Sequence, residues 1–189
     1  YLVVIPAPAG RTAPIGTPDT QEAWEAAHRR EWELAVDSVR QAARYAAERG
    51  VELALEPINR YETYLVTNLA EALAFINEVD MDNLHVHLDT FHMNIEESSP
   101  AEAILRAGDQ LVNLHVADSN RETPGRGHLD FAGILNALQE TGYEGVLALE
   151  PVPPGSDPLL VSQFPKNRPL RDIYAKEGIA YLKQIEANL

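Results

Sequence analysis

Four titratable residues, Glu56, Asp89, His115 and Glu150, each stand at the end of a short apolar run. Because side chains alternate across a strand, these four fall on the face opposite the large aliphatic residues of their runs. Three carboxylates in one confined site cannot all stay ionised without a compensating cation. Two glutamates, an aspartate and a histidine form an oxygen-rich donor set that suits Mn²⁺, Mg²⁺ or Co²⁺ better than structural zinc. The pattern therefore predicts a divalent-metal site.

Each of these residues taken alone also has an ordinary interpretation. A single acid at a strand end caps a loop or forms a surface ion pair about as often as it serves a site. Four such residues on one inferred face are much harder to explain in this way. The shared face is therefore the observation that favours a metal site.

The elements that must position these residues alternate along the chain as strand and helix. Asn68, three residues before Glu71, is typical of a helix start, and Gly50 is typical of a helix end. Alternation at about 30-residue spacing indicates βαβ units and a parallel sheet, whose strand ends carry the active sites of barrels and open α/β folds. Strands are predicted at 1–6, 51–56, 84–89, 111–117 and 145–150, and helices at 21–49, 68–79, 99–108, 130–141 and 171–187.

The composition of the 189 residues excludes several classes of protein. The chain is 45% hydrophobic and 23% charged, which is typical of a soluble globular domain. Its net charge of −14 repels phosphate backbones and anionic lipid, so no nucleic acid and no membrane partner is expected. No apolar run approaches the ~20 residues that cross a bilayer. The absence of cysteine excludes disulfides and thiolate ligands and is compatible with the cytoplasmic location that we expect.

Five longer motifs make the sequence resemble a known family. The resemblance is close over about residues 50–151 and looser in the flanks. It is to the D-tagatose 3-epimerase / D-psicose 3-epimerase family of xylose-isomerase-like TIM barrels, and it implies an α/β fold of the (β/α)8 type. The motifs are LEPINRYE at 55–62, HLDTFHMNIEE at 87–97, HVADSNR at 115–121, PGRGHLDF at 124–131 and LEP at 149–151.

The resemblance implies a ligand set and a cofactor. The metal ligands of the family fall on Glu56, Asp89, His115 and Glu150, the four residues that the strand-face argument selects. Their separations of 26 to 35 residues fit one ligand for each successive βα unit. The implied cofactor is one divalent ion, with Mn²⁺ preferred and Co²⁺ or Mg²⁺ as alternatives.

The resemblance also implies three substrate-binding residues, Glu62, His92 and Arg121. Glu62 and Arg121 each come six residues after a strand-end ligand, on loops where a sugar would lie. Arg121 alone would be read as a surface arginine, and His92 alone as a loop histidine. Their positions inside matched motifs favour a role in binding. His85 and His87 match no functional position of the family and are interpreted as core or supporting residues.

The activity implied by the resemblance is epimerisation of a ketose at C3. The family removes and returns a proton at C3 through a metal-bound enediolate, and Glu56 and Glu150 are the implied acid/base pair on the two faces of this intermediate. The implied partners are a small sugar and further copies of the chain, in a dimer or a tetramer.

Three further functions stay open. The same superfamily contains aldose–ketose isomerases, hydroxypyruvate isomerases and inosose-processing enzymes, which reuse this metal site. An isomerase would move the proton between C1 and C2 on one face of the sugar. The second alternative is a protein without catalytic activity, a remnant of such a barrel that binds a metal or a sugar. An endonuclease fits less well, because a multi-zinc phosphodiesterase site needs more histidines and a basic groove. A sugar phosphate is also an open substrate class, although Arg60, Arg121 and Arg126 are the obvious cations of these loops.

The length indicates how much of a barrel this sequence contains. A complete (β/α)8 barrel typically has about 250 residues. Five predicted strands with ligands on the last four correspond to strands four to eight of the family. We therefore expect residues 1–189 to form a single domain, the C-terminal portion of a xylose-isomerase-like TIM barrel, from which the first three βα units are missing.

Overall fold

The computed structural model describes residues 1–16, 19–155 and 158–189. Residues 17–18, in the loop expected before the first helix, and 156–157, after the last strand, lie outside the described residues. The chain divides into two compact units. Unit 1 contains Tyr1–Leu88 and Gln110–Val112, and unit 2 contains Asp89–Asp109 and Asn113–Leu189. Among the described residues, no helix has the length and apolar character needed to cross a membrane.

Strands and helices alternate along the chain, as the sequence predicts. The strands follow the order β1-β2-β3-β4-β5 in the sheet, and β1–β2, β2–β3 and β4–β5 pair in parallel. The elements are β1 (Leu2–Val4), α1 (Gln21–Ala47), β2 (Leu53–Leu55), α2 (Leu69–Val79), β3 (Leu84–Asp89), α3 (Thr90–Glu96), α4 (Pro100–Ala107), the 3₁₀ turn η1 (Gly108–Gln110), β4 (Leu111–Val116), α5 (Phe131–Glu140), β5 (Val146–Leu149), α6 (Pro158–Gln163), the 3₁₀ turn η2 (Pro165–Asn167) and α7 (Arg168–Glu186).

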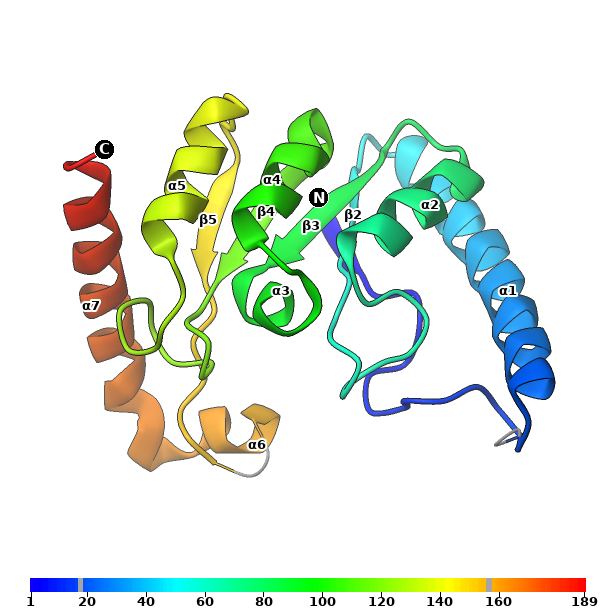
Figure 1. The fold of residues 1–189 in the computed structure, drawn as a ribbon, viewed down its shortest axis with the longest axis horizontal. Coiled ribbons are helices and arrows are strands. Elements are labelled where there is room, and N and C mark those ends of the chain that lie inside the picture. The colour runs from blue at the N-terminus through cyan, green and yellow to red at the C-terminus, as the bar shows by residue number, and fades with distance from the viewer. Residues whose placement is uncertain (17–18, 156–157) are drawn as a thin grey trace. The chain divides into compact units, whose positions relative to one another are not determined.

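In unit 1 the helices α1 and α2 lie side by side and pack on the strands (Figure 1). The spacing of Val36, Val39, Ala43 and Ala46 places these four buried residues on one face of α1. They share a core with Phe75 of α2, which is fully buried, and with the leucines of β2. This core holds β2 and β3 in place, and with them the segments that leave their carboxyl ends.

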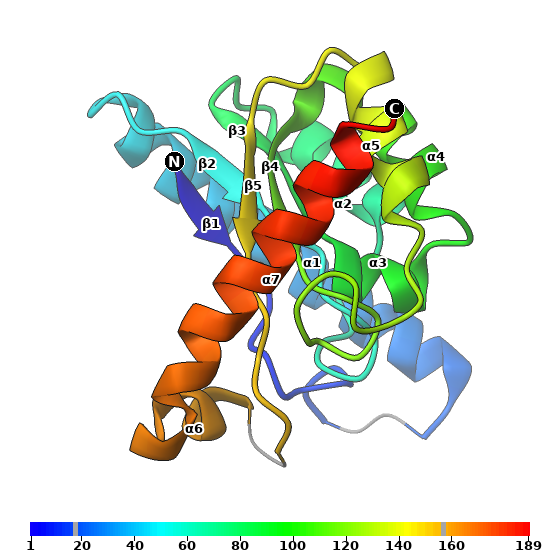
Figure 2. The same ribbon diagram turned by 90° about the vertical axis from the view of Figure 1, so that its left-hand side faces the viewer.

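In unit 2 the helices α4, α5 and α7 are neighbours, and Figure 2 shows α7 running alongside α5. Ile104 of α4, Leu114 of β4 and Ile134 of α5 are almost completely buried. The rings of Phe131 and Tyr181 meet edge to face, with centroids 6.0 Å apart. Burial of Leu114 against these helices fixes β4 beneath them, whereas β5 has exposed and half-buried residues and is held by its parallel pairing with β4.

Every predicted strand and helix is present, and the differences lie at the ends and in the loops. The strand predicted at 1–6 is shorter, and the terminal helix predicted at 171–187 begins at Arg168. Two further helices, α3 and α6, are present that the sequence pattern does not predict. For α3 the reason is its cap: Asp89 ends β3 and its side chain also accepts a hydrogen bond from the backbone N–H of Phe91.

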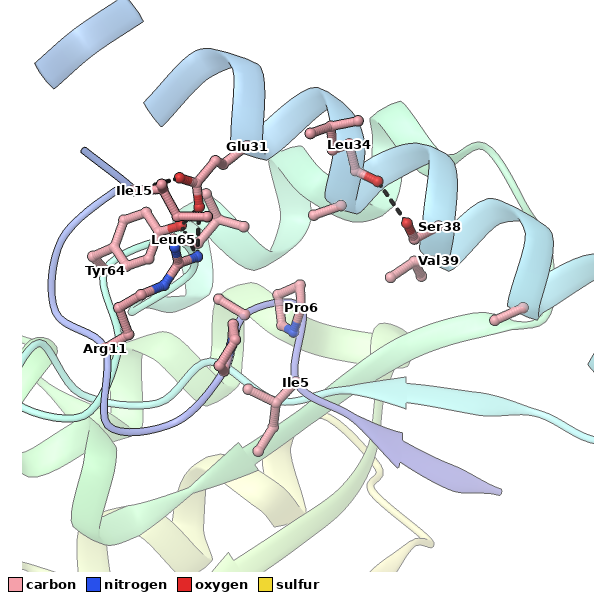
Figure 3. Close-up of a pocket in the computed structure, with 14 residues that line it drawn as sticks. Ile5, Pro6, Arg11, Ile15, Glu31, Leu34, Ser38, Val39, Tyr64 and Leu65 are labelled. Atoms are coloured by element: carbon pink, nitrogen blue, oxygen red, sulfur yellow. Dashed lines mark hydrogen bonds and ion pairs between the residues drawn. The ribbon is translucent and has the colours of Figure 1, made fainter. Parts of the chain in front are cut away.

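A hollow of about 450 Å³ lies in unit 1 between α1 and the segment that follows β1 (Figure 3). Its apolar wall includes Ile5 and Leu34. Its polar wall is a cluster in which Arg11 Nη2 donates to Glu31 Oε2 at 2.5 Å and to the Tyr64 hydroxyl oxygen at 2.8 Å. The Tyr64 hydroxyl in turn donates to Glu31. Burial and the Glu31 carboxylate together raise the pKa of Tyr64 to about 12.

The cluster of Arg11, Glu31 and Tyr64 predicts a change in the pKa of Tyr64 that can be measured. In Glu31→Gln the negative charge is gone, so we expect the pKa of Tyr64 to fall from about 12 toward the ordinary value of about 10. NMR titration of ring-labelled tyrosine, with Tyr64→Phe assigning the signal, measures this shift. Tyr174, whose pKa burial and Glu122 raise to about 12, is the control and should not change. An unchanged Tyr64 pKa in Glu31→Gln would contradict the role of the carboxylate.

Candidate functional site

Asp89, His115 and Glu150 gather at the carboxyl ends of β3, β4 and β5 in unit 2. Each offers a ligand atom, and these atoms lie within 4.8 Å of one another. His115 Nδ1 is 2.9 Å from Glu150 Oε2 and 3.8 Å from Asp89 Oδ2. The strand register explains the meeting, because His115 is paired with Ala148 and Glu150 comes two residues later on the same face. Asp89 is fully buried.

Arg121 bridges the two acids of this cluster. Its Nη1 donates to Asp89 Oδ2 at 2.6 Å, and its Nη2 donates to Glu150. The guanidinium also lies over the ring of Phe91, 4.9 Å from the centroid. Arg121 has a positive φ of 65°, so its backbone adopts the left-handed conformation as the chain turns back toward the strand ends. The loop position that the sequence predicts for Arg121 therefore brings its charge onto two of the proposed ligands.

The arginine and the histidine set the charge state of Glu150. Burial of Glu150 opposes ionisation, but the hydrogen bond with His115 and the charge of Arg121 outweigh burial and lower the pKa of Glu150 to about 2. Glu150 is therefore ionised at neutral pH. Arg121 supplies positive charge to an acidic cluster in a chain whose overall charge is −14.

Glu56 belongs to unit 1, where it directly follows β2 and is 7% exposed. Its backbone N–H donates to the carbonyl of Val4 at 3.0 Å, which extends the β1–β2 pairing. Its Oε1 lies 3.5 Å from Nε2 of His87, a fully buried histidine on β3. Ala54 pairs with His85, so Glu56 and His87, two residues further along, are level with each other.

His87, which the sequence predicts only as a core or supporting residue, is thus a neighbour of the candidate ligand Glu56. The alternation of side chains already places His87 on the same face as Asp89. What the sequence lacks is the register between β2 and β3, which decides that His87 faces Glu56. His85, at the opposite end of the strand, instead pairs with Glu52 at 3.0 Å.

The remaining candidates, Glu62 and His92, are held in separate local settings. In unit 1, Glu62 Oε1 accepts a hydrogen bond from Nδ2 of the buried Asn59 at 2.8 Å. In unit 2, His92 is a buried residue of α3. Its ring lies edge to face with the ring of Phe91, and the two ring centroids are 5.4 Å apart. Unit 2 brings Asp89, His115, Glu150 and Arg121 into contact, and unit 1 holds Glu56 beside His87.

The donor set in unit 2 fits a divalent cation. Two carboxylates and one imidazole converge, and one of the carboxylates, Asp89, is fully buried. Carboxylate and imidazole donors together suit Mn²⁺, Co²⁺ or Mg²⁺. Because an ionised carboxylate at this depth needs a compensating charge, the arrangement can bind a cation or keep Arg121 in that role.

Comparison with known proteins finds similarity to sugar epimerases. The chain is 46% identical over 121 residues to a D-psicose 3-epimerase of Ruminiclostridium cellulolyticum, a match that covers 64% of this chain and 41% of that protein. The structure of a D-psicose 3-epimerase with D-tagatose from Clostridium cellulolyticum H10 has a TM-score of 0.78 at 31% identity, and the match covers 97% of this chain and 64% of that one. The structure of a 3-keto-D-glucoside 4-epimerase from E. coli has a TM-score of 0.77 at 30% identity and covers 96% and 63% of the two chains.

The chain spans about two fifths of the length of that curated relative and less than two thirds of each solved chain. Residues 2–185 match the family model described as xylose isomerase-like TIM barrel. The resemblance and the partial-barrel fold predicted from the sequence are thereby confirmed. The chain belongs to the xylose isomerase-like TIM barrel family, and its five strands and their helices are a part of such a barrel.

Proposed function

We propose that this chain carries the acid/base site of a divalent-metal-dependent ketose 3-epimerase, an isomerase that inverts C3 of a ketose. The observation that carries the proposal is the cluster of Asp89, His115 and Glu150 in unit 2, with Arg121 joined to both acids. The name of the similar D-psicose 3-epimerase supports the choice of reaction.

The proposed ligands of the metal are Glu56, Asp89, His115 and Glu150. The three in unit 2 support this set by the chemistry of their donors, two carboxylates and an imidazole. Mn²⁺ is our first choice, with Co²⁺ or Mg²⁺ as alternatives. When bound, a divalent cation would acidify the C–H beside the ketone by withdrawing charge from the sugar oxygens.

Glu56 and Glu150 are the proposed acid/base pair. One carboxylate removes the C3 proton, which leaves a planar enediolate, and the carboxylic acid of the other glutamate returns a proton to the opposite face. Glu150 is ionised at neutral pH, which is the form that can accept the C3 proton. The carboxylate of Glu56, the other member of the pair, has the buried His87 as a neighbour at 3.5 Å.

Arg121, His92 and Glu62 are the proposed sugar-binding residues. Arg121 and His92 would hold the O1/O2 end of the ketose, and Glu62 would accept a hydrogen bond from a sugar hydroxyl. In these roles Arg121 both orients the sugar and lowers the pKa of Glu150.

A second candidate is epimerisation at C4 of a keto sugar. The similarity to a 3-keto-D-glucoside 4-epimerase, with a TM-score of 0.77, favours this reaction over aldose–ketose isomerisation. The two epimerisations place the exchanged hydrogen on different carbons. Incubation of the protein with a panel of ketoses and keto sugars in D₂O, followed by NMR, distinguishes them: deuterium at C3 supports our proposal, deuterium at C4 supports the second candidate, and transfer between C1 and C2 would indicate an aldose–ketose isomerase.

The acid/base role makes Glu150→Gln the decisive activity variant. An amide cannot accept the C3 proton, so we expect turnover to fall by roughly 10³-fold while the circular dichroism spectrum is retained. Glu144→Gln is a matched control, because Glu144 is exposed and lies six residues earlier. Activity of Glu150→Gln within a few fold of the unaltered protein would contradict the assignment.

The contact of Arg121 with two ligands predicts an effect on metal affinity. Arg121→Gln removes a positive charge 2.6 Å from Asp89 Oδ2, so we expect Mn²⁺ to bind on the order of tenfold more tightly in calorimetry. Arg121→Lys keeps the charge and should bind Mn²⁺ like the unaltered protein. Weaker Mn²⁺ binding by Arg121→Gln would show that the arginine supports the ligands rather than competing with the cation.

A further inference from the structure

The loop between β4 and α5, in unit 2, is organised around the carboxylate of Asp118. This side chain is 1% exposed. Its Oδ1 accepts hydrogen bonds from the backbone N–H groups of Ser119 at 2.8 Å and Leu129 at 3.2 Å, and its Oδ2 accepts one from Gly125 at 2.9 Å. One buried carboxylate thus joins residues that are up to eleven positions apart in the sequence.

The backbone of Asp118 defines the turn that contains Arg121. The N–H of Arg121 donates to the carbonyl of Asp118 at 2.8 Å, and the N–H of Asp118 donates to the carbonyl of Glu122 at 2.8 Å. Arg121 occupies this turn with its φ of 65°, a conformation that a non-glycine residue keeps only when its surroundings impose it. The carbonyl of Arg121 then accepts from Val152, just beyond β5.

The loop is also shaped to receive this carboxylate. A Cβ on Gly127 would stand 2.1 Å from Asp118 Oδ1, so a side chain at this position would force the carboxylate to move. Gly125, the donor to Oδ2, has a φ of 93°, which favours glycine. The backbone N–H groups of Ser119, Gly125 and Leu129 compensate the buried charge, and such backbone hydrogen bonds outweigh burial and lower the pKa of Asp118.

We infer that Asp118 is a positioning residue that holds Arg121 against Asp89 and Glu150. Its own oxygens bind the loop backbone, so it acts on the site only through Arg121. The effect on catalysis rests on the proposed function. The effect on the loop does not, and the two are measured separately.

Asp118→Asn is the first test, by hydrogen exchange. The amide is close in size, but its NH₂ group would face backbone N–H donors and lose their hydrogen bonds. We expect the amides of residues 119–129 to exchange at least about tenfold faster. Glu177→Gln is the control, because Glu177 binds the same loop through the Arg126 side chain and is exposed. Unchanged exchange in Asp118→Asn, or equal acceleration in Glu177→Gln, would overturn the inference.

The second test asks whether Asp118 acts through Arg121. In Asp118→Asn we expect kcat/KM for the ketose to fall roughly 10- to 100-fold, mainly through KM. Introduced into Arg121→Gln, the same substitution should cause no further loss, because residues that act as a unit are not additive. A full additional loss in the double variant would indicate general destabilisation and contradict the inference.

Gly127→Ala provides an independent variant if Asp118→Asn does not fold. It displaces the same carboxylate while keeping its charge, so it should show the same faster exchange and the same lack of additivity with Arg121→Gln. If no ketose is turned over by the unaltered protein, the proposed function fails, and the exchange experiment still decides whether Asp118 holds the loop.

Discussion

The constraint on which unit 2 depends is the compensation of a fully buried carboxylate, Asp89. One of its oxygens accepts a hydrogen bond from the backbone N–H of Phe91 and so starts α3, and the other is bound by Arg121. An ionised group at this depth would be very costly without such partners. The same residue therefore ends a strand, begins a helix and fixes the position of an arginine. These three roles follow from one charge and its two oxygens.

Among the described residues of unit 2, two buried acids have their charges compensated in different ways. Asp118 is surrounded by backbone N–H groups, which are part of the loop and cannot leave it. Asp89 is paired with the guanidinium of Arg121, which a divalent cation can replace as the compensating charge. The first arrangement suits a fixed support and the second suits a site that exchanges partners. The difference between them is why we assign binding to Asp89 and positioning to Asp118.

The sequence predicts the parts of this arrangement that follow from the two-residue period of a strand. Alternation alone places Asp89, His115 and Glu150 on one face, and in unit 2 their ligand atoms do converge. It does not predict that His87 lies beside Glu56, because that contact depends on the register between β2 and β3. It also misses α3, a helix of seven residues whose cap is a strand residue. Prediction therefore fails where a contact depends on strand register, as for His87, and where one residue serves two elements, as Asp89 does.

The number of residues between a site residue and the nearest strand determines which interactions can hold it in place. Asp89 and His115 lie on strands and Glu150 directly follows one, so sheet register alone locates their backbones. Arg121 stands five residues beyond β4, where the register of the sheet has no influence. Its position depends on the buried carboxylate of Asp118 and on Gly125 and Gly127, which leave room for that carboxylate. A buried strand-end residue such as Asp89 is therefore costly to change, because it is tied to the core. Loop residues can change with less disturbance to the sheet, so under the proposed function a different sugar specificity would be reached through the loops while the proposed ligands stay in place.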